Sequence, residues 1–287
     1  MSNPLISAAE LLQLVNAPTG NLVLLDVRWV LGRNDNVEQY LAGHLPGAVF
    51  VDLERELSGR TGEHTGRHPL PDPADFQAAA RRWGIEDDAQ VVVYDDAGAL
   101  AAARCWWLLR HAGFTSVRVL DGGLEAWRQL KGPLELGPVE PTPGQVNLSW
   151  GAMPVLEHEQ LEGYSGVLID SRATARYLGI EEPVDPVAGH IPGALNRPTT
   201  DNLNSQAHFR SSSELREAFG KLGVPQAGPE QPGAAAYCGS GVTAAHQVLA
   251  AELAGLPLAL YPGSYSQYVS YPQAPVVTSD EKHRDRR

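Results

Sequence analysis

The sequence predicts an α/β protein built from two tandem domains of the same fold. The first observation is an internal repeat: residues 24–28 (Leu-Leu-Asp-Val-Arg) return as residues 168–172 (Leu-Ile-Asp-Ser-Arg), and residues 43–48 return as residues 189–194. The second is that short apolar runs alternate with segments of helical periodicity, as in a mostly parallel sheet flanked by helices. The third is the length of 287 residues, which suffices for two ordinary domains.

Each element of the first copy has its own local signal. Ser7 and Glu10 form a capping box that predicts a helix over residues 7–15. Continuous apolar runs predict strands at 22–26, 90–94 and 116–120, and the segments between and after them predict helices at 100–111 and 124–130. Ligands of such sheets bind beyond the carboxyl ends of the strands, so we expect the site there.

The repeat also predicts the domain boundaries. Corresponding motifs are 141 to 146 residues apart, which is too long a period for a solenoid. We expect a first domain over residues 1–136, a proline-containing linker over 137–151 that is fairly stiff, and a second domain over 152–278. The polar residues 279–287 are expected to form a flexible tail.

Charge and composition restrict the class of function. The net charge of −12 argues against nucleic acid or an anionic membrane as a main partner. The N-terminus lacks the pattern of a signal peptide, and no apolar run approaches the ~20 residues of a membrane span. Two cysteines with no metal-like spacing predict neither a disulfide framework nor a zinc site. We therefore expect a cytoplasmic protein without metal or cofactor.

The stretch around Cys238 is the candidate for chemistry. Small residues and Tyr237 lead into this cysteine, Gly239 and Gly241 follow it, and an alanine-rich segment then resembles the start of a helix. Backbone N–H groups of such a loop form an anion-binding nest that favours a thiolate, so we interpret Cys238 as a nucleophile. The alternative is a small buried cysteine in a strand–helix turn. A tyrosine-phosphatase loop would need arginine at Ala244, so that function is excluded.

The first copy lacks this nucleophile. Asp95 occupies the position that corresponds to Cys238, and a carboxylate cannot act as a thiol. The first domain is therefore expected to be catalytically blank and to serve as structural support and as one wall of the cleft. Cys105 lies in an apolar helical segment beside Trp106, which indicates core packing.

These motifs together resemble the rhodanese superfamily, specifically its tandem-domain sulfurtransferases. The similarity covers residues 22–268 and rests on the paired Asp-x-Arg and Gly-His-x-Pro-Gly-Ala segments, on residues 120–127 (Leu-Asp-Gly-Gly-Leu-Glu-Ala-Trp) and on the Cys238 loop. The resemblance implies two rhodanese-like domains of which only the second is catalytic. It also implies that the cysteine takes a sulfane sulfur from a small anionic donor, becomes a persulfide and passes the sulfur to cyanide or a thiol, with thioredoxin as one candidate acceptor.

Within the family, the loop from Cys238 to Thr243 resembles that of 3-mercaptopyruvate sulfurtransferases rather than the Cys-Arg-Lys-Gly-Val-Thr loop of thiosulfate-using rhodaneses. The resemblance assigns Ser240, His68 and Glu54 to a relay that moves a proton to the pyruvate enolate. Imidazole suits that task because it titrates near working pH. The resemblance also implies substrate contacts from Gly239, Gly241, Val242 and Thr243.

A further match and two departures bear on the donor. Arg176 corresponds to the arginine that binds the substrate carboxylate in the family, although a solvent-facing arginine is the alternative. The second arginine of the family is replaced here by Val184, and the usual Gly-Ser-Trp-x-Glu-Trp segment is changed at residues 263–268. Donor preference between mercaptopyruvate and thiosulfate therefore stays open.

Other histidines and other functions remain as alternatives. His64 could compete with His68 for the relay, His44 and His190 belong to the repeated motif and are expected to be structural, and His246 has no assigned role. A non-catalytic rhodanese-like module that binds a protein partner is the main competing class, and Cys238 counts against it. A thiol hydrolase or phosphatase that acts on oxyanion esters is the third class, and the missing phosphate-binding arginine disfavours it most.

Overall fold

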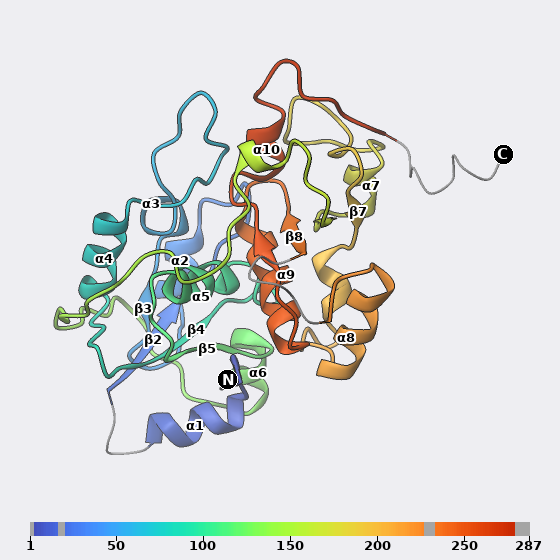
Figure 1. Cartoon of the computed structure of the whole chain (residues 1–287). Coiled ribbons are helices and arrows are strands. Elements are labelled where there is room, and N and C mark those ends of the chain that lie inside the picture. The colour runs from blue at the N-terminus through green and yellow to red at the C-terminus, as the bar shows by residue number, and fades with distance from the viewer. Residues whose placement is uncertain (1–2, 17–20, 227–232, 279–287) are drawn as a thin grey trace. The chain divides into compact units, whose positions relative to one another are not determined.

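The computed structural model describes residues 3–16, 21–226 and 233–278, so the predicted tail at 279–287 lies outside the described residues (Figure 1). Its contacts divide the chain into two compact units. The first unit comprises Met1–Gly59, Pro71–Met153 and Leu203–Phe209, and the second comprises Arg60–Leu70, Pro154–Asn202 and Arg210–Arg287. Each unit is described by itself below.

The first unit is built on a parallel sheet in the order β1-β5-β4-β2-β3. Its central strand β4 is apolar and buried from Val91 to Tyr94, which is why it occupies the middle of the sheet. The strands are β1 (Leu5–Ile6), β2 (Leu22–Asp26), β3 (Val49–Phe50), β4 (Gln90–Tyr94) and β5 (Val117–Leu120). The helices are α1 (Ala8–Asn16), α2 (Asn36–Leu41), α3 (Leu53–Glu56), α4 (Pro73–Arg82), α5 (Ala102–His111) and α6 (Gly123–Gln129).

The second unit repeats this plan with a parallel sheet in the order β7-β6-β8-β9. Its strands are β6 (Val167–Asp170), β7 (Leu195–Asn196), β8 (Ala234–Tyr237) and β9 (Ala259–Leu260). Its helices are α7 (Thr174–Tyr177), α8 (Ser212–Lys221), α9 (Val242–Leu253) and α10 (Ser264–Tyr268), with 3-10 turns η1 (His158–Gln160) and η2 (Thr199–Asn202). Strand β8 pairs with β6 as β4 pairs with β2, so the predicted α/β repeat is confirmed.

The strands predicted at 22–26 and 90–94 are confirmed residue for residue. The helix predicted over 100–111 begins two residues later, at Ala102. The reason is local, because the carboxylate of Asp95 accepts hydrogen bonds from the N–H groups of Ala99 and Ala101 and thereby holds the preceding turn outside the helix.

The repeated Asp-x-Arg motif performs the same structural task in both units. Arg28 pairs with Asp26 at 2.8 Å, and Arg172 pairs with Asp170 at 2.6 Å, all four side chains being buried at the end of a strand. Each guanidinium also donates to the carbonyl of the glycine that opens the Gly-His motif of its own unit. Buried charges are stable only when paired and hydrogen-bonded in this way.

The two histidines of the repeated motif are packed inside their units. Both ring nitrogens of His44 lie 2.9 Å from backbone carbonyl oxygens, those of Leu45 and Gly137. The ring of His190 stacks on Tyr177 at 3.6 Å, and its Nδ1 lies 2.7 Å from the carbonyl oxygen of that tyrosine. These contacts support the structural role expected of both histidines.

Two segments group differently from the boundaries predicted from the repeat. Residues 137–151, the predicted linker, belong to the first unit and hydrogen-bond along it, for example from Gly144 N–H to the carbonyl of Arg81 and from Ser149 N–H to that of Ala112. Residues 60–70 belong by their contacts to the second unit. The predicted domain boundaries themselves stay a prediction.

Candidate active site

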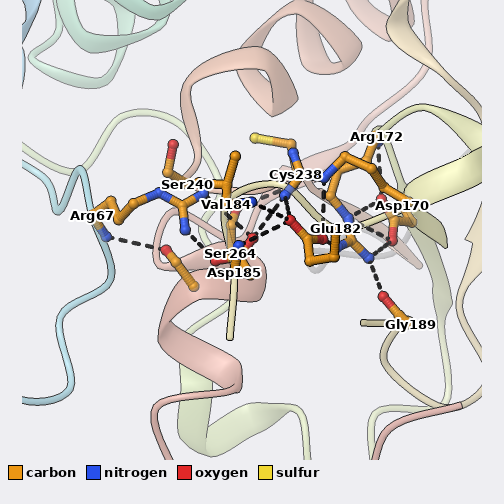
Figure 2. A network of polar contacts seen from close by, with 12 residues as sticks. Arg67, Asp170, Arg172, Glu182, Val184, Asp185, Gly189, Cys238, Ser240 and Ser264 are labelled. Atoms are coloured by element: carbon orange, nitrogen blue, oxygen red, sulfur yellow. Dashed lines mark hydrogen bonds and ion pairs between the residues drawn. The ribbon is translucent and has the colours of Figure 1, made fainter. Parts of the chain in front are cut away.

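Cys238 lies where strand β8 ends and a short loop turns into helix α9. Its side chain is 2% exposed, and the N–H of Gly241 donates to its Sγ at 3.1 Å. The N–H of Cys238 itself donates to Oγ of Ser264, at the start of α10 (Figure 2). The sulfur therefore lies at the carboxyl edge of the sheet, inside a loop whose backbone is anchored on both sides.

The loop has its shape because of Gly241. This residue has φ +81°, and a Cβ here would overlap the carbonyl oxygen of Pro262. A side chain at this position would therefore be both strained and sterically blocked. The glycine that the sequence pattern singled out is the residue that turns its N–H toward Sγ.

Ser240 and His68 are brought together in the second unit. Nδ1 of His68 lies 2.7 Å from Oγ of Ser240, and both side chains are buried. The segment that carries His68 is tied to the second unit by two hydrogen bonds: Arg67 N–H donates to Oγ of Ser266, and the side-chain amide of Gln267 donates to the carbonyl of His64. The predicted Ser–His pairing is thus present in the geometry, although its catalytic role stays a prediction.

The predicted acid of the relay, Glu54, belongs to the first unit. It lies in the first turn of α3, where Asp52 caps the helix by accepting the N–H groups of residues 54 and 55. Its carboxylate accepts a hydrogen bond from Nε1 of Trp29 at 2.9 Å. The role of Glu54 in the relay stays a prediction from the family resemblance.

Arg176 lies on α7 and is paired with two carboxylates. Its Nη2 donates to Glu182 at 2.6 Å and to Asp185 at 2.8 Å, and its Nε donates to Glu182 at 3.1 Å. Burial alone would raise the pKa of the Glu182 carboxyl, but the hydrogen bonds from Arg176 and from two backbone N–H groups lower it below its usual value. Arg176 therefore pairs with the carboxylates of the loop at 182–185 and is not the solvent-facing arginine of the alternative interpretation.

A second guanidinium at this place escaped the sequence analysis. Arg67 forms an ion pair with Asp185, and Figure 2 shows Arg67 and Arg172 at opposite ends of one network with Asp185 and Glu182 between them. Its position beside His68 was visible in the sequence. No local pattern indicated that it would meet a residue 118 positions away.

The remaining histidines of the second unit are engaged elsewhere. His64 stacks on Tyr271 at 4.2 Å, and its Nδ1 lies 3.0 Å from Oγ of Ser270, whereas it is His68 that meets Ser240. His246 is buried within α9, with its Nδ1 3.4 Å from the side-chain amide of Asn202. The geometry favours His68 over His64 as the partner of the serine.

The matching loop of the first unit is filled by its own anion. The carboxylate of Asp95 is buried and accepts four backbone N–H groups, from Ala97, Ala99, Ala101 and Ala102, at 2.8 to 3.0 Å. Burial raises the pKa of this carboxyl, and the four N–H donors oppose that rise. The strand-end loop of the first unit thus directs four backbone N–H groups at the side chain in the position that corresponds to Cys238, which is the arrangement that the nest interpretation describes.

Cys105 lies in α5 and is fully buried. Burial raises the pKa of its thiol far above the usual value, which keeps it protonated and unreactive.

Within the part of the chain that the structure describes, no group of three or more His, Cys, Asp or Glu side chains could hold a metal ion, and no helix is long and apolar enough to cross a membrane.

Comparison with known families agrees with this architecture. The model of the rhodanese-like domain matches residues 7–130 and again residues 156–271. The chain belongs to the rhodanese family. The two matched ranges place one rhodanese-like domain in each half of the sequence, so both the family resemblance and the predicted fold class are confirmed.

Alignments with named relatives cover nearly the whole chain of this rhodanese-family protein. It is 45% identical to the putative thiosulfate sulfurtransferase SseB of Mycobacterium tuberculosis over 95% of this chain and 96% of that protein. It is 42% identical to the probable 3-mercaptopyruvate sulfurtransferase of Pseudomonas aeruginosa, covering 97% and 99%. The crystal structure of the 3-mercaptopyruvate sulfurtransferase SseA from Escherichia coli superposes with a TM-score of 0.78 at 33% identity, covering 92% of this chain and all of that one.

Proposed function

We propose that the protein is a sulfurtransferase that carries a sulfane sulfur on Cys238 from a small anionic donor to a thiophilic acceptor. The observation that carries the proposal is the position of Sγ at the carboxyl edge of the sheet, where it accepts the Gly241 N–H within a loop whose Ser240 meets His68. Relatives named as 3-mercaptopyruvate and thiosulfate sulfurtransferases support it.

The proposed reaction has two half-reactions. The Cys238 thiolate attacks the sulfur of 3-mercaptopyruvate, the carbon–sulfur bond breaks, and its electron pair goes to carbon, so that a persulfide and the enolate of pyruvate are formed. With thiosulfate, the sulfur–sulfur bond breaks instead and sulfite leaves. The acceptor then attacks the outer sulfur of the persulfide, and the Cys238 thiolate is restored.

Ser240 and His68 have a role only with the first of these donors. The enolate of pyruvate must take up a proton at carbon, whereas sulfite leaves without one. A hydroxyl hydrogen-bonded to an imidazole at 2.7 Å can deliver that proton and be reprotonated from the ring. Arg176 and Arg67 would bind the donor carboxylate by charge-assisted hydrogen bonds, and Glu54 would orient His68.

The finer parts of the proposal concern acceptor and location. Cyanide or a thiol, thioredoxin among them, is the acceptor class that attacks a persulfide sulfur, and a reducing cytoplasm would keep Cys238 as a thiol. A thiosulfate-preferring rhodanese is the second candidate, favoured by the name of the Mycobacterium tuberculosis relative. A non-catalytic binding module is disfavoured by Cys238, and a phosphatase by Ala244.

The test is mass spectrometry of the protein after incubation with each donor. We expect the peptide that contains Cys238 to gain the mass of one sulfur atom and to lose it again when cyanide is added, with thiocyanate as product. Cys238→Ala should abolish both signals, whereas Cys105→Ala, a buried cysteine of the first unit, should keep them. An unmodified Cys238 peptide with both donors would contradict the proposal.

A further inference from the structure

The arginines next to the Cys238 loop already hold an acidic partner from the chain itself. The side chain of Asp185 is fully buried and bridges two guanidinium groups: it pairs with Arg67 and accepts from Nη2 of Arg176 at 2.8 Å. These contacts belong to an arginine–carboxylate network in the second unit (Figure 2). Its members are Arg67, Arg172, Arg176, Asp170, Glu182 and Asp185.

The network borders the nucleophile directly. A Cβ built on Gly239, the residue after Cys238, would lie 2.9 Å from Nη2 of Arg67 and 3.5 Å from Nη1 of Arg176. Among the described residues, Nε of Arg67 is also buried without a hydrogen-bond partner. A donor whose sulfur is attacked by Cys238 would therefore place its anionic group beside these two guanidiniums.

The charges of the arginine–carboxylate network are balanced before any donor binds. In the described part of the chain, the network contains three guanidinium groups and three carboxylates, so its formal charge is zero. An incoming anion meets two arginines whose positive charge Asp185 and Glu182 together already offset. Its repulsion by the Asp185 carboxylate is proportional to its own charge and is twice as large for a dianion as for a monoanion.

The backbone around Asp185 is held in a tight turn, so its carboxylate is fixed beside Arg67 and Arg176. Oε1 of Glu182 accepts the N–H of Val184 at 3.1 Å and the N–H of Asp185 at 2.9 Å, which closes a tight turn. Pro183 and Pro186 restrict the backbone on both sides of this turn. The negative charge therefore stays beside the arginines while the donor binds.

We propose that Asp185 is a specificity-determining residue that selects singly charged donors over doubly charged ones. It disfavours a dianion such as thiosulfate and tolerates a thiol that carries one carboxylate, such as 3-mercaptopyruvate. This inference rests on the proposed sulfur transfer, because it assigns the class of donor that the same site would use. Arg67 then supplies the second guanidinium that is missing at Val184.

The experiment is a calorimetric titration of the full chain with two anions that contain no sulfane sulfur: inorganic sulfate, a dianion, and pyruvate, a monoanion. The variant is Asp185→Asn, which removes the charge and keeps the shape of the side chain. Because repulsion scales with ligand charge, the Kd of pyruvate should fall by about threefold and that of sulfate by about tenfold, which is about 1.4 kcal/mol. The factor for sulfate should thus be close to the square of that for pyruvate.

Two further variants complete the experiment. Glu181→Gln removes an equal charge from an exposed position of the same loop and should change either Kd by less than about twofold, because exposed charges are screened. Val184→Arg adds a positive charge directly beside Asp185, at the position of the family's second arginine, and should tighten sulfate more than pyruvate, which tests the charge argument even if Asp185→Asn fails to fold. Equal factors for both anions in Asp185→Asn and in Val184→Arg, or an effect of Glu181→Gln as large as that of Asp185→Asn, would overturn the inference.

Turnover is measured separately from anion binding. If the wild-type protein transfers sulfur but the ratio of the two Kd values does not move in Asp185→Asn, only the role of Asp185 is wrong. If the ratio moves but no persulfide forms on Cys238 with either donor, the proposed sulfur transfer is wrong and the anion preference stands.

Discussion

At the scale of single residues, the candidate site places the Cys238 thiol close to a hydrogen-bonded serine–histidine pair. Cys238 is held by the Gly241 N–H, and Ser240, two residues further on, is turned toward His68. In the proposed mechanism, the same loop presents a thiol for bond formation and a hydroxyl for proton delivery. Such a division is useful only when the leaving group is a carbon anion, and this distinguishes the two candidate donors.

The first prediction concerns His68. His68→Gln should lower kcat with 3-mercaptopyruvate by about 10²-fold, because general acid catalysis of that size is lost, while kcat with thiosulfate changes little. His64→Gln is the matched control, since His64 lies four residues earlier and stacks on Tyr271. Steady-state rates of pyruvate and sulfite release measure the two reactions. An equal loss with both donors would show that His68 only positions the loop.

At the scale of elements, the strand–loop–helix unit from β8 to α9 depends on one backbone conformation. Gly241 has φ +81° and packs against the carbonyl of Pro262, so its torsion and its lack of a side chain are both needed. Gly193 in the same unit also has a positive φ, +79°, but nothing lies within 4 Å of a Cβ built there. Alanine substitutions at the two glycines therefore separate the loss of stability caused by the positive φ from the loss caused by steric overlap of the new methyl group.

The second prediction uses this pair. Gly193→Ala should lower the free energy of unfolding by about 1 kcal/mol through the torsion alone. Gly241→Ala should lower it by about 1–3 kcal/mol more because the methyl group overlaps the Pro262 carbonyl, and persulfide formation on Cys238 should be lost. Urea denaturation of both variants measures the difference, and equal costs at the two positions would contradict the proposed crowding.

The sequence was most informative where the interaction is local. Cys238, Ser240 and the glycines could be located because the loop is one continuous stretch, and the strands at 22–26 and 90–94 could be located because they are unbroken apolar runs. Arg67 and Asp185 were missed because their ion pair joins positions 118 residues apart and neither lies in a repeated motif. The grouping of residues 60–70 with the second unit likewise rests on contacts between residues far apart in the sequence.

At the scale of the whole molecule, each unit contains a histidine that burial keeps less basic than usual. In the first unit, burial lowers the pKa of His111, which stacks on Trp107 at 4.6 Å. In the second, burial lowers the pKa of His158, which stacks on Tyr271 at 4.1 Å. The unfolded chain, with ordinary histidines near pKa ~6.5, therefore binds these protons more readily than the folded protein.

The third prediction is the resulting pH dependence of stability. Because both folded-state pKa values are lowered, the stabilisation is fully present above about pH 6.5 and is lost as the pH falls toward the folded-state values. The urea midpoint should therefore decrease between neutral and mildly acidic pH. His111→Asn should make this decrease shallower, and a slope identical to that of the wild-type protein would rule out a contribution from His111.

The assignment of residues 60–70 to the second unit determines which fragment of the chain could contain the whole candidate site. A fragment cut at the sequence repeat, from about residue 152 onward, would keep Cys238 and Arg176 but would leave behind the imidazole and the guanidinium that His68 and Arg67 provide. Under the proposed mechanism, the unit that contains Cys238 therefore depends on residues 60–70, which lie within the first half of the sequence.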